Sequence, residues 1–364
     1  MKSIFLISAS FLLFSFSNAQ RTYFLTDIEG SPQTLEQRMD YHKVQGASLA
    51  IIRNFEMDTL ITLGVRDQKQ GLSVNENTLF QMGSMTGAIV NFAVLRLVAA
   101  GRIDLDAPAN DYLTSWKIEA KSFTKRKPIT VRDLILERRG FNPVYKPQGY
   151  LPGIELPSVQ QILAGEAPSN LAALDLKKNK SKKSSLANDL ILQILLEDIY
   201  NKSFAAIIEA QVFQPLNMTQ SIIAAELSDE QKQNACIGYE ENGTVIEGER
   251  LVYPELAHSG LWSTPQDYAK FVLHVLKAAQ GLDNSLLNQE LAKAGIEPQY
   301  GNNALILLKG DNQIYWGGAP RGFYSQMAAS AEEGWVVVGC SNRQLAWQFV
   351  NWDLNSRAIE YAKR

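Results

Sequence analysis

Two apolar runs rich in β-branched residues lie near the start of the chain, at Gly46–Asn54 and Asp58–Asp67, with a short polar turn between them. Runs of this length, bounded by polar residues, are typical of β-strands, and their close spacing predicts a hairpin. Further strand-like runs appear only near the end of the chain, at Asn303–Gly310, Gly322–Ser330 and Gly334–Asn342. The pattern therefore predicts strands at both ends of the chain.

Between these ends the apolar positions follow helical spacing. One such run begins at Ala88 and is stopped by Gly101. Asp189–Tyr200 and Asp267–Ala279 are amphipathic as well, and a final amphipathic helix is expected from about Trp347 to Ala362. We therefore predict an α+β fold, in which an antiparallel sheet from both chain ends is flanked by helices and interrupted by an inserted helical region.

The chain divides into a leader and one domain. Residues 1–19 combine a basic residue, an apolar run and a small-residue pattern, which predicts a secretory signal peptide. A membrane anchor is the alternative, but the apolar run is short for a bilayer span. Residues 20–364 are expected to form the domain, with 20–79 and 302–364 forming the sheet and 80–301 mainly helical. We expect a secreted or periplasmic protein with no membrane span after signal cleavage.

The composition is that of an ordinary globular protein, with 46% hydrophobic residues, 20% charged residues and a net charge of −3. This balance gives no electrostatic reason to expect nucleic acid. His42, His258 and His274 are scattered without metal-ligand spacing, so no metal and no other cofactor is expected. Export permits a disulfide between Cys236 and Cys340, but the apolar run around Cys340 favours a buried thiol.

Several segments, spread over nearly all of the mature chain and in a fixed order, resemble one family. They are "GASLAIIRN", "NTLFQMGSMTGAIV", "LVAAGRIDLDAP", "ITVRDLILERRGF", "FAAIIEAQVFQPLNMTQS", "SGLWSTPQDYAKF" and "GGAPRGFYSQ" before "WVVVGCSN". Together they are similar to the serine β-lactamase and penicillin-binding-protein superfamily, in particular to its class C β-lactamase and D-alanyl-D-alanine carboxypeptidase branch. The resemblance implies a β-lactamase/transpeptidase-like fold.

The first motif of that family, S-x-x-K, has lost its lysine. The resemblance places the nucleophile at Ser84 and the base at Gly87. A serine hydroxyl is a weak nucleophile until a base takes its proton, and residues three apart on a helix share a face. Because glycine has no side chain, the activation route of the family is missing at this position.

The second motif, Y-x-N, is also altered. It aligns with Ser184-Ser185-Leu186, and a shift of two residues recovers Asn188 while leaving Leu186 at the tyrosine position. In either register the phenol that relays protons in active members is absent. Ser184 and Asn188 are therefore candidate binding residues only.

The third motif, K-T-G or H-x-G, is replaced by Trp316-Gly317-Gly318, which we regard as candidate binding residues. An indole has a single donor and cannot replace a head that binds a carboxylate or relays a proton. Packing in the strand and stacking on a ligand are both open roles for Trp316. The resemblance further implies an oxyanion hole made by the backbone N–H groups of Ser84 and Ala319, which does not depend on side chains.

Three catalytic positions have changed together, and the segment that resembles H-T-S-G has become Glu137-Arg138-Arg139-Gly140. General acid–base assistance contributes a factor of roughly 10² to 10⁴ to the rate. When catalytic residues act as a unit, removing one of them loses nearly all of this factor. The sequence therefore favours a catalytically inactive relative, a pseudoenzyme that binds a small peptide, a cell-wall fragment or a protein partner.

Two alternatives are left open. One is an active serine hydrolase that acts on esters, peptides or β-lactams through Ser84 with another base. The basic loop 177–183 could supply that base or point to a carboxylate-bearing ligand, although mutual repulsion favours a solvated loop. His258 stands next to Ser259, but sequence neighbours rarely have serine–histidine geometry, so no such pair is expected. The other alternative is an interaction module with a closed cleft.

Overall fold

The computed structural model describes residues 26–28, 31–119, 121–138, 141–142, 147–176, 186–310 and 313–364. The predicted signal peptide, Ser184 and the basic loop lie outside the described residues.

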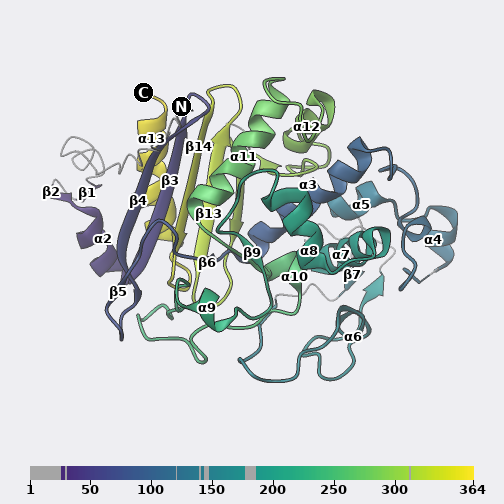
Figure 1. The fold of residues 1–364 in the computed structure, drawn as a ribbon, viewed down its shortest axis with the longest axis horizontal. Helices are drawn as coiled ribbons and strands as arrows, with labels where there is room; N and C mark the ends of the chain where they lie inside the picture. The colour runs from purple at the N-terminus through teal and green to yellow at the C-terminus, as the bar shows by residue number, and fades with distance from the viewer. Residues whose placement is uncertain are drawn as a thin grey trace, which may run out of the picture.

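The largest sheet has seven strands in the order β11-β12-β13-β14-β3-β4-β5, and each neighbouring pair is antiparallel (Figure 1). In the pairing of β14 with β3, Val338 lies opposite Ala50, so the end of the chain joins its beginning. The predicted α+β fold and the predicted hairpin are confirmed. The strands are β3 Gly46–Arg53, β4 Glu56–Asp67, β5 Leu72–Ser73, β11 Leu308–Lys309, β12 Ile314–Gly318, β13 Tyr324–Ser330 and β14 Trp335–Ser341.

The other elements are short strands and the helices of the middle of the chain. The remaining strands are β1 Thr26–Ile28, β2 Ser31–Gln33, β6 Phe80–Gln81, β7 Phe141–Asn142, β8 Asp175–Leu176, β9 Ile222–Ile223 and β10 Leu261–Ser263. The α-helices are α2 Leu35–His42, α3 Thr86–Ala99, α4 Ser122–Arg126, α5 Val131–Ile135, α6 Val159–Ala164, α7 Leu186–Tyr200, α8 Phe204–Ile208, α9 Asp229–Lys232, α10 Leu256–Ser259, α11 Pro265–Ala279, α12 Gln289–Ile296 and α13 Ser356–Ala362. Gly83–Met85 and Ala109–Asp111 are 3₁₀ turns (η1, η2), and Glu209–Phe213 and Phe349–Asn355 are π-helical (η3, η4).

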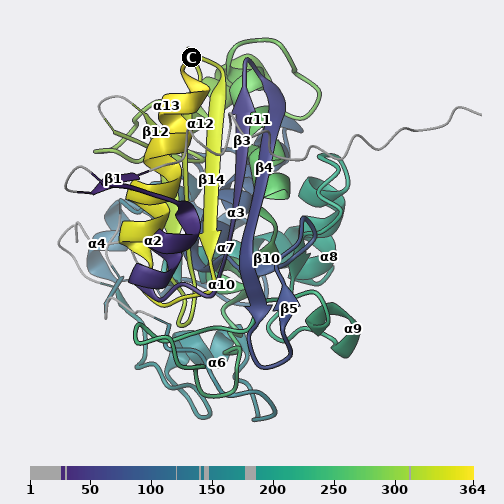
Figure 2. The same ribbon diagram turned by 90° about the vertical axis from the view of Figure 1, so that its left-hand side faces the viewer.

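The central strand β3 is buried on both faces because helices cover both sides of the sheet. Successive side chains of a strand point to opposite faces. Leu49 and Ile51 pack in a cluster with α2 and α13, whereas Ala50 and Ile52 belong to the larger cluster that includes α3 and α11. Figures 1 and 2 show α13 and α2 on one side of the sheet and α11 on the other.

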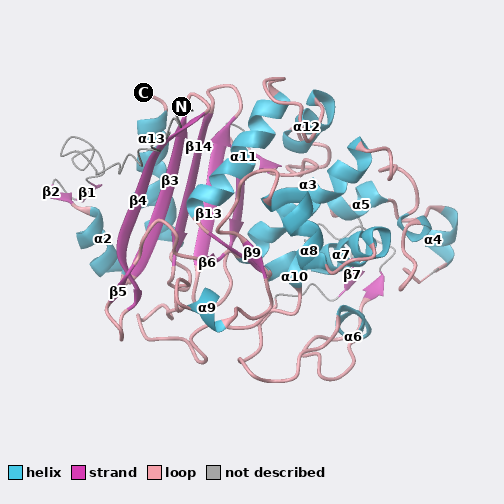
Figure 3. Cartoon of the chain, viewed as in Figure 1, coloured by secondary structure: helices cyan, strands magenta, loops and turns pink. Residues whose placement is uncertain are grey.

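The helices of the middle of the chain gather beside one face of the sheet, as Figure 3 shows. Among them α3 is buried from Thr86 to Leu95, because it contacts α7, α8 and α10 within this group. An apolar helix of this kind is stable only inside a larger core. The burial of α3 fixes the position of η1, the turn directly before it, where Ser84 lies.

Two sequence expectations differ from the structure. The strand expected at Asn303–Gly310 is confined to Leu308–Lys309. The buried residues before it donate backbone hydrogen bonds to Ala294 and Gly295 at the end of α12, so their apolar character serves helix packing and not a sheet ladder. The final helix begins with a π-helical segment, Phe349–Asn355, before α13.

Candidate active site

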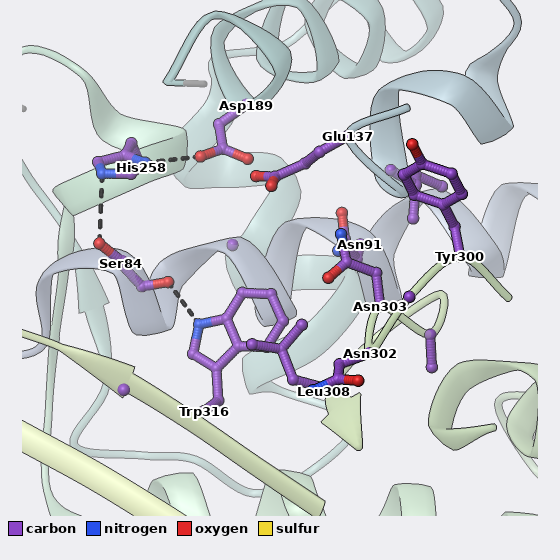
Figure 4. Close-up of a pocket in the computed structure, with 15 residues that line it drawn as sticks. Ser84, Asn91, Glu137, Asp189, His258, Tyr300, Asn302, Asn303, Leu308 and Trp316 are labelled. Atoms are coloured by element: carbon purple, nitrogen blue, oxygen red, sulfur yellow. Dashed lines mark hydrogen bonds and ion pairs between the residues drawn. The ribbon is translucent and has the colours of Figure 1, made fainter. Parts of the chain in front are cut away.

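A cavity of about 670 Å³ opens where the first turn of α3, the start of α7, α10 and β12 meet (Figure 4). Its lining residues include Ser84, Gly87, Asn91, Glu137, Asp189, His258 and Trp316. The serine identified from the family motif therefore faces open space and not the core.

Backbone geometry at Gly83 places Ser84 at this cavity. Gly83 has φ +53°, a conformation that costs residues with a β-carbon energy. An added Cβ there would lie 2.6 Å from Cδ of Pro320. The Thr86 hydroxyl donates to the Gly83 carbonyl at 2.7 Å and closes the turn. The glycine before the serine is thus required by the turn itself.

Ser84 is the first member of a hydrogen-bonded series of three side chains. Its Oγ lies 3.3 Å from Nε2 of His258 on α10, and Nδ1 of His258 lies 2.6 Å from Oδ2 of Asp189 on α7. With the proton on Nδ1 donated to the carboxylate, Nε2 is the acceptor for the serine hydroxyl. This is the serine, base and orienting-acid arrangement that activates a hydroxyl nucleophile.

The electrostatic surroundings of His258 raise the pKa of its imidazole. Burial alone lowers the pKa of His258, but the hydrogen bond and charge of Asp189, together with the charges of Glu255 and Glu137, outweigh burial and raise it. Glu255 is 1% exposed, precedes α10, and lies three residues before His258. The pKa of His258 therefore lies above its usual value.

The two residues that replace the lysine and the head of the third motif are coupled in space. A Cβ added at Gly87 would lie 3.3 Å from Cζ2 of Trp316 and 3.8 Å from Oδ1 of Asp189. The Trp316 indole donates to the Ser84 carbonyl at 2.7 Å, as the dashed line in Figure 4 shows. This bond holds the ring beside position 87. The tryptophan occupies the space into which a lysine would extend.

The predicted oxyanion-hole residues lie on adjoining backbone segments. A Cβ added at Gly318 would lie 1.9 Å from the Met82 carbonyl oxygen and 3.1 Å from the Ser84 nitrogen. Only glycine permits this approach of β12 to η1, the turn before α3. Ala319, whose N–H is the second predicted donor, is the next residue, and the role of the two N–H groups remains a prediction.

The other predicted binding residues are only partly brought together. Gly317 lines the cavity with Trp316. Asn188 is 1% exposed, and neither amide atom has a hydrogen-bond partner in the described part of the chain. It does not line the cavity, whereas its neighbour Asp189 does. The helical face that reaches the site is therefore one residue beyond the one that the motif alignment selected.

Sequence reasoning did not select His258 or Asp189. His258 was weighed only against Ser259, its neighbour in the chain, but it lies beside Ser84. The available signal was the presence of an aspartate directly after the degenerate Y-x-N position and a histidine directly before "SGLWST". Both flank family segments that surround the site.

The described residues contain no group of three or more histidine, cysteine, aspartate or glutamate side chains placed to hold a metal ion. Within the same residues, none of the helices has both the length and the apolar character needed to cross a membrane. Cys236 and Cys340 are buried free thiols, and burial raises the pKa of Cys340 to about 12.

The fold is similar to two solved structures. FmtA from Staphylococcus aureus aligns with a TM-score of 0.69 and 18% identity over 89% of this chain and 88% of that one. An octameric penicillin-binding protein homologue from Pyrococcus abyssi aligns with a TM-score of 0.70 and 17% identity over 91% of this chain and 76% of that one. At such identities the likeness concerns the fold alone.

Sequence comparison gives relatives of this chain and a family model that matches it. Esterase EstB of Burkholderia gladioli is 29% identical over 50% of this chain and 48% of its own length, and the teichoic acid D-alanine hydrolase of S. aureus is 25% identical over 63% and 53%. The chain thus spans about half the length of these two relatives. The Beta-lactamase family model matches residues 32–355, which is most of the chain, and the chain belongs to the Beta-lactamase family.

Proposed function

We propose that the protein is an active serine hydrolase in which Ser84 is the nucleophile, His258 the general base and Asp189 the residue that orients the imidazole. The observation that carries this proposal is the continuous pair of hydrogen bonds from Ser84 Oγ through the imidazole to the Asp189 carboxylate. The inactivity favoured by the sequence rests on the missing lysine. A histidine on another element offers a different base for the same hydroxyl.

The proposed reaction proceeds through an acyl-enzyme. Ser84 Oγ attacks the carbonyl carbon of the substrate while its proton passes to Nε2 of His258. The tetrahedral intermediate collapses, the bond to the leaving group breaks, and the leaving group takes that proton. Water then attacks the acyl-enzyme, gives a proton to Nε2, and is released as part of the acid when Ser84 Oγ regains its proton.

The geometry suits this role in the free protein. The Oγ to Nε2 distance of 3.3 Å exceeds that of a short hydrogen bond, but such bonds are often long before substrate binds. The Asp189 carboxylate fixes the tautomer and stabilises the imidazolium that forms. The backbone N–H groups of Ser84 and Ala319 are proposed to stabilise the developing oxyanion.

An ester is the first substrate class to test. The names of the two sequence relatives describe an esterase and a hydrolase of teichoic acid D-alanine, and both describe hydrolysis. The cavity is large enough for a small acyl group because ligand sites of a few hundred Å³ hold molecules of that size.

A fluorophosphonate probe with intact-mass analysis tests the nucleophile and its base. We expect a single adduct on Ser84, none in Ser84→Ala, and labelling at least about 100-fold slower in His258→Gln. His274→Gln is the matched control, because His274 is also buried and paired with an aspartate, Asp283, but does not line the cavity. It should label at the rate of the wild type.

A folded wild-type protein that stays unlabelled would contradict the proposal. That result would support the inert alternative, in which the cavity binds a small peptide, a cell-wall fragment or a protein partner. Thermal unfolding with added muropeptides then measures such binding.

We also propose export, supported by the N-terminal pattern of residues 1–19. A chain purified from its source that retains these residues by mass would contradict it.

A further inference from the structure

The short helix α10 carries His258, and two side chains of α7 bond to it. We propose that one of them, Gln193, is a positioning residue for the proposed reaction: it holds the α10 backbone so that the His258 imidazole stays beside Ser84. Gln193 does not line the cavity and therefore acts through His258. This inference rests on the proposed function, because it concerns the base of that reaction.

The helix α10 depends on its neighbours for its position. It has only four residues, Leu256–Ser259, and its N-cap residue, Glu255, makes no side-chain cap hydrogen bond. A helix this short is not stable by itself, so its place is set by tertiary contacts. Its main contacts are with α7 and α3. The position of His258 is therefore decided by the elements around α10.

One backbone N–H at the start of α10 is bonded from α7. The first N–H groups of a helix have no acceptor within it. The His258 N–H donates to the Glu255 carbonyl at 3.0 Å. The N–H of the residue before it, Ala257, donates to Oε1 of Gln193 at 3.2 Å. Gln193 thus provides from another helix the side-chain cap that Glu255 does not provide.

The ring and the main chain of the base are both held from one face of α7. Asp189 and Gln193 are four residues apart on this helix, so they lie on the same face. Oδ2 of Asp189 lies 2.6 Å from Nδ1 of His258, and Gln193 accepts from the backbone one residue earlier. The first contact sets the orientation of the imidazole. The second sets the place of the backbone from which the imidazole extends.

Gln193 is itself fixed on both sides of its amide. It is 3% exposed, and its Nε2 donates to Oε1 of Glu197 at 3.5 Å. The same oxygen accepts from the Phe204 N–H at 3.0 Å. Burial raises the pKa of Glu197, while these two hydrogen bonds oppose that shift and favour the carboxylate. Because a carboxylate only accepts, it keeps Nε2 toward Glu197 and Oε1 toward Ala257.

The loss of this support should affect the catalytic step and not substrate binding. Since Gln193 does not line the cavity, its replacement removes no contact with the substrate. Ala257 is fully buried, so its N–H would be left without an acceptor, and α10 would shift to find one. A displacement of about 1 Å can cost on the order of 100-fold in rate.

Gln193→Met tests the inference, because methionine is of similar length and removes the amide acceptor. We expect kcat for an ester to fall by about 10- to 100-fold and KM to stay within about twofold, at a pH where His258 is neutral. Fluorophosphonate labelling should slow by a similar factor.

Asn110→Leu is the matched control for lost stability. The Asn110 amide also bonds to backbone groups, the N–H and the carbonyl of Ile118, at 2.8 and 2.9 Å, and it does not line the cavity. We expect Asn110→Leu to lower the urea midpoint while kcat stays within about twofold of the wild type. An equal fall of kcat in the control would overturn the inference, because lost stability would then explain the effect of Gln193→Met.

An exchange of the two side chains of α7 tests positioning by rescue. In the double variant Gln193→Glu/Glu197→Gln, the carboxylate at position 193 can accept from Ala257 and from the new amide at position 197. The acceptor for α10 is therefore kept. We expect kcat of the double variant to lie within about threefold of the wild type. A folded double variant as slow as Gln193→Met would overturn the inference.

The outcomes separate this inference from the proposed function. If the wild type is labelled at Ser84 and folded Gln193→Met is labelled at the same rate, only this inference is overturned. If Gln193→Met does not fold, Gln193→Asn carries the same expectation, because its shorter amide does not reach Ala257. A folded wild type that the fluorophosphonate does not label would overturn the proposed function, and this inference with it.

Discussion

Two histidine–aspartate pairs in the described part of the chain are joined through Nδ1, and they differ in what lies beyond the other ring nitrogen. His258 lies 2.6 Å from Asp189, and His274 lies 3.0 Å from Asp283. Nε2 of His258 lies 3.3 Å from Oγ of Ser84, whereas Nε2 of His274 is buried with no hydrogen-bond partner in the described residues. A histidine that is paired with a carboxylate can therefore act as a catalytic base only where a nucleophile lies beside its second nitrogen.

The pKa values of the two histidines are shifted in opposite directions. Burial is the largest influence on His274 and lowers its pKa; Asp283 opposes this shift, while Arg96 and Lys277 reinforce it. The pKa of His258 is raised because negative charges surround it. Acidic neighbours therefore raise the pKa of the histidine at the cavity, whereas burial lowers the pKa of the histidine in the helical core.

Replacing each histidine in turn by glutamine should give the largest difference in activity between the two pairs. His258→Gln removes the base, and we expect kcat/KM for an ester to fall by about 10³- to 10⁴-fold. His274→Gln should leave kcat/KM within about twofold and lower the free energy of unfolding by about 1–3 kcal/mol, because a buried ring in contact with Phe92 is lost. Steady-state kinetics and urea unfolding measure the two effects. Equal kinetic losses in both variants would remove the distinction.

Replacement of the two aspartates should give a smaller version of the same contrast. Asp189→Asn keeps the size of the side chain but removes the charge that fixes the His258 tautomer, so we expect a fall of about 10²- to 10³-fold in kcat/KM. Asp283→Asn should leave kcat/KM nearly unchanged. Comparable activity of Asp189→Asn and wild type would mean that the imidazole is oriented without the carboxylate.

Most of the fold could be predicted because it depends on local pattern and order along the chain. The hairpin of β3 and β4 and the helix α11 follow from strand and helix periodicity. The run Asn303–Gly310 misled because an apolar run packed against a helix end resembles a strand in sequence. The choice between the two is made by a distant partner, α12.

Of the three proposed catalytic side chains only Ser84 could be predicted, because a family motif marks it; the motif alignment also selected Trp316 and Gly317, which line the cavity. The partners of Ser84 cannot be found by motif spacing, since Ser84 and His258 are 174 residues apart and His258 and Asp189 are 69 apart. A missing lysine is visible in the sequence, but a base that arrives from another helix is visible only in three dimensions. The contact of Trp316 with position 87 is hidden for the same reason.

Introducing the family lysine at position 87 should therefore destabilise the protein. The Gly87→Lys side chain would enter the space of the Trp316 ring, and such overpacking costs typically 1–3 kcal/mol of stability. We expect a loss of that size in urea unfolding and no gain in activity. Gly87→Ala is the control: its Cβ contact at 3.3 Å is offset by better helix propensity, so the change should be below about 1 kcal/mol.

A double-variant cycle shows whether the two positions act as one unit. If Trp316 is the obstacle, Gly87→Lys should be less destabilising in a Trp316→Gly background than in the wild type, with a coupling above about 0.5 kcal/mol. Additive losses would mean that the lysine is excluded by Asp189 or by the helix and not by the ring. A rise in ester hydrolysis in Gly87→Lys would contradict the steric account.

The smallest expected effect concerns the charge beside His258. Neutral His258 is the base, so kcat/KM falls as the pH drops through its pKa. Glu255→Gln removes a buried carboxylate whose charge raises that pKa, so the acidic limb of the profile should move to lower pH. Asp283→Asn should leave the limb in place, because that carboxylate acts on His274. A limb that moves in the control, or that moves upward in Glu255→Gln, would mean that the titrating group is not the imidazole beside Ser84.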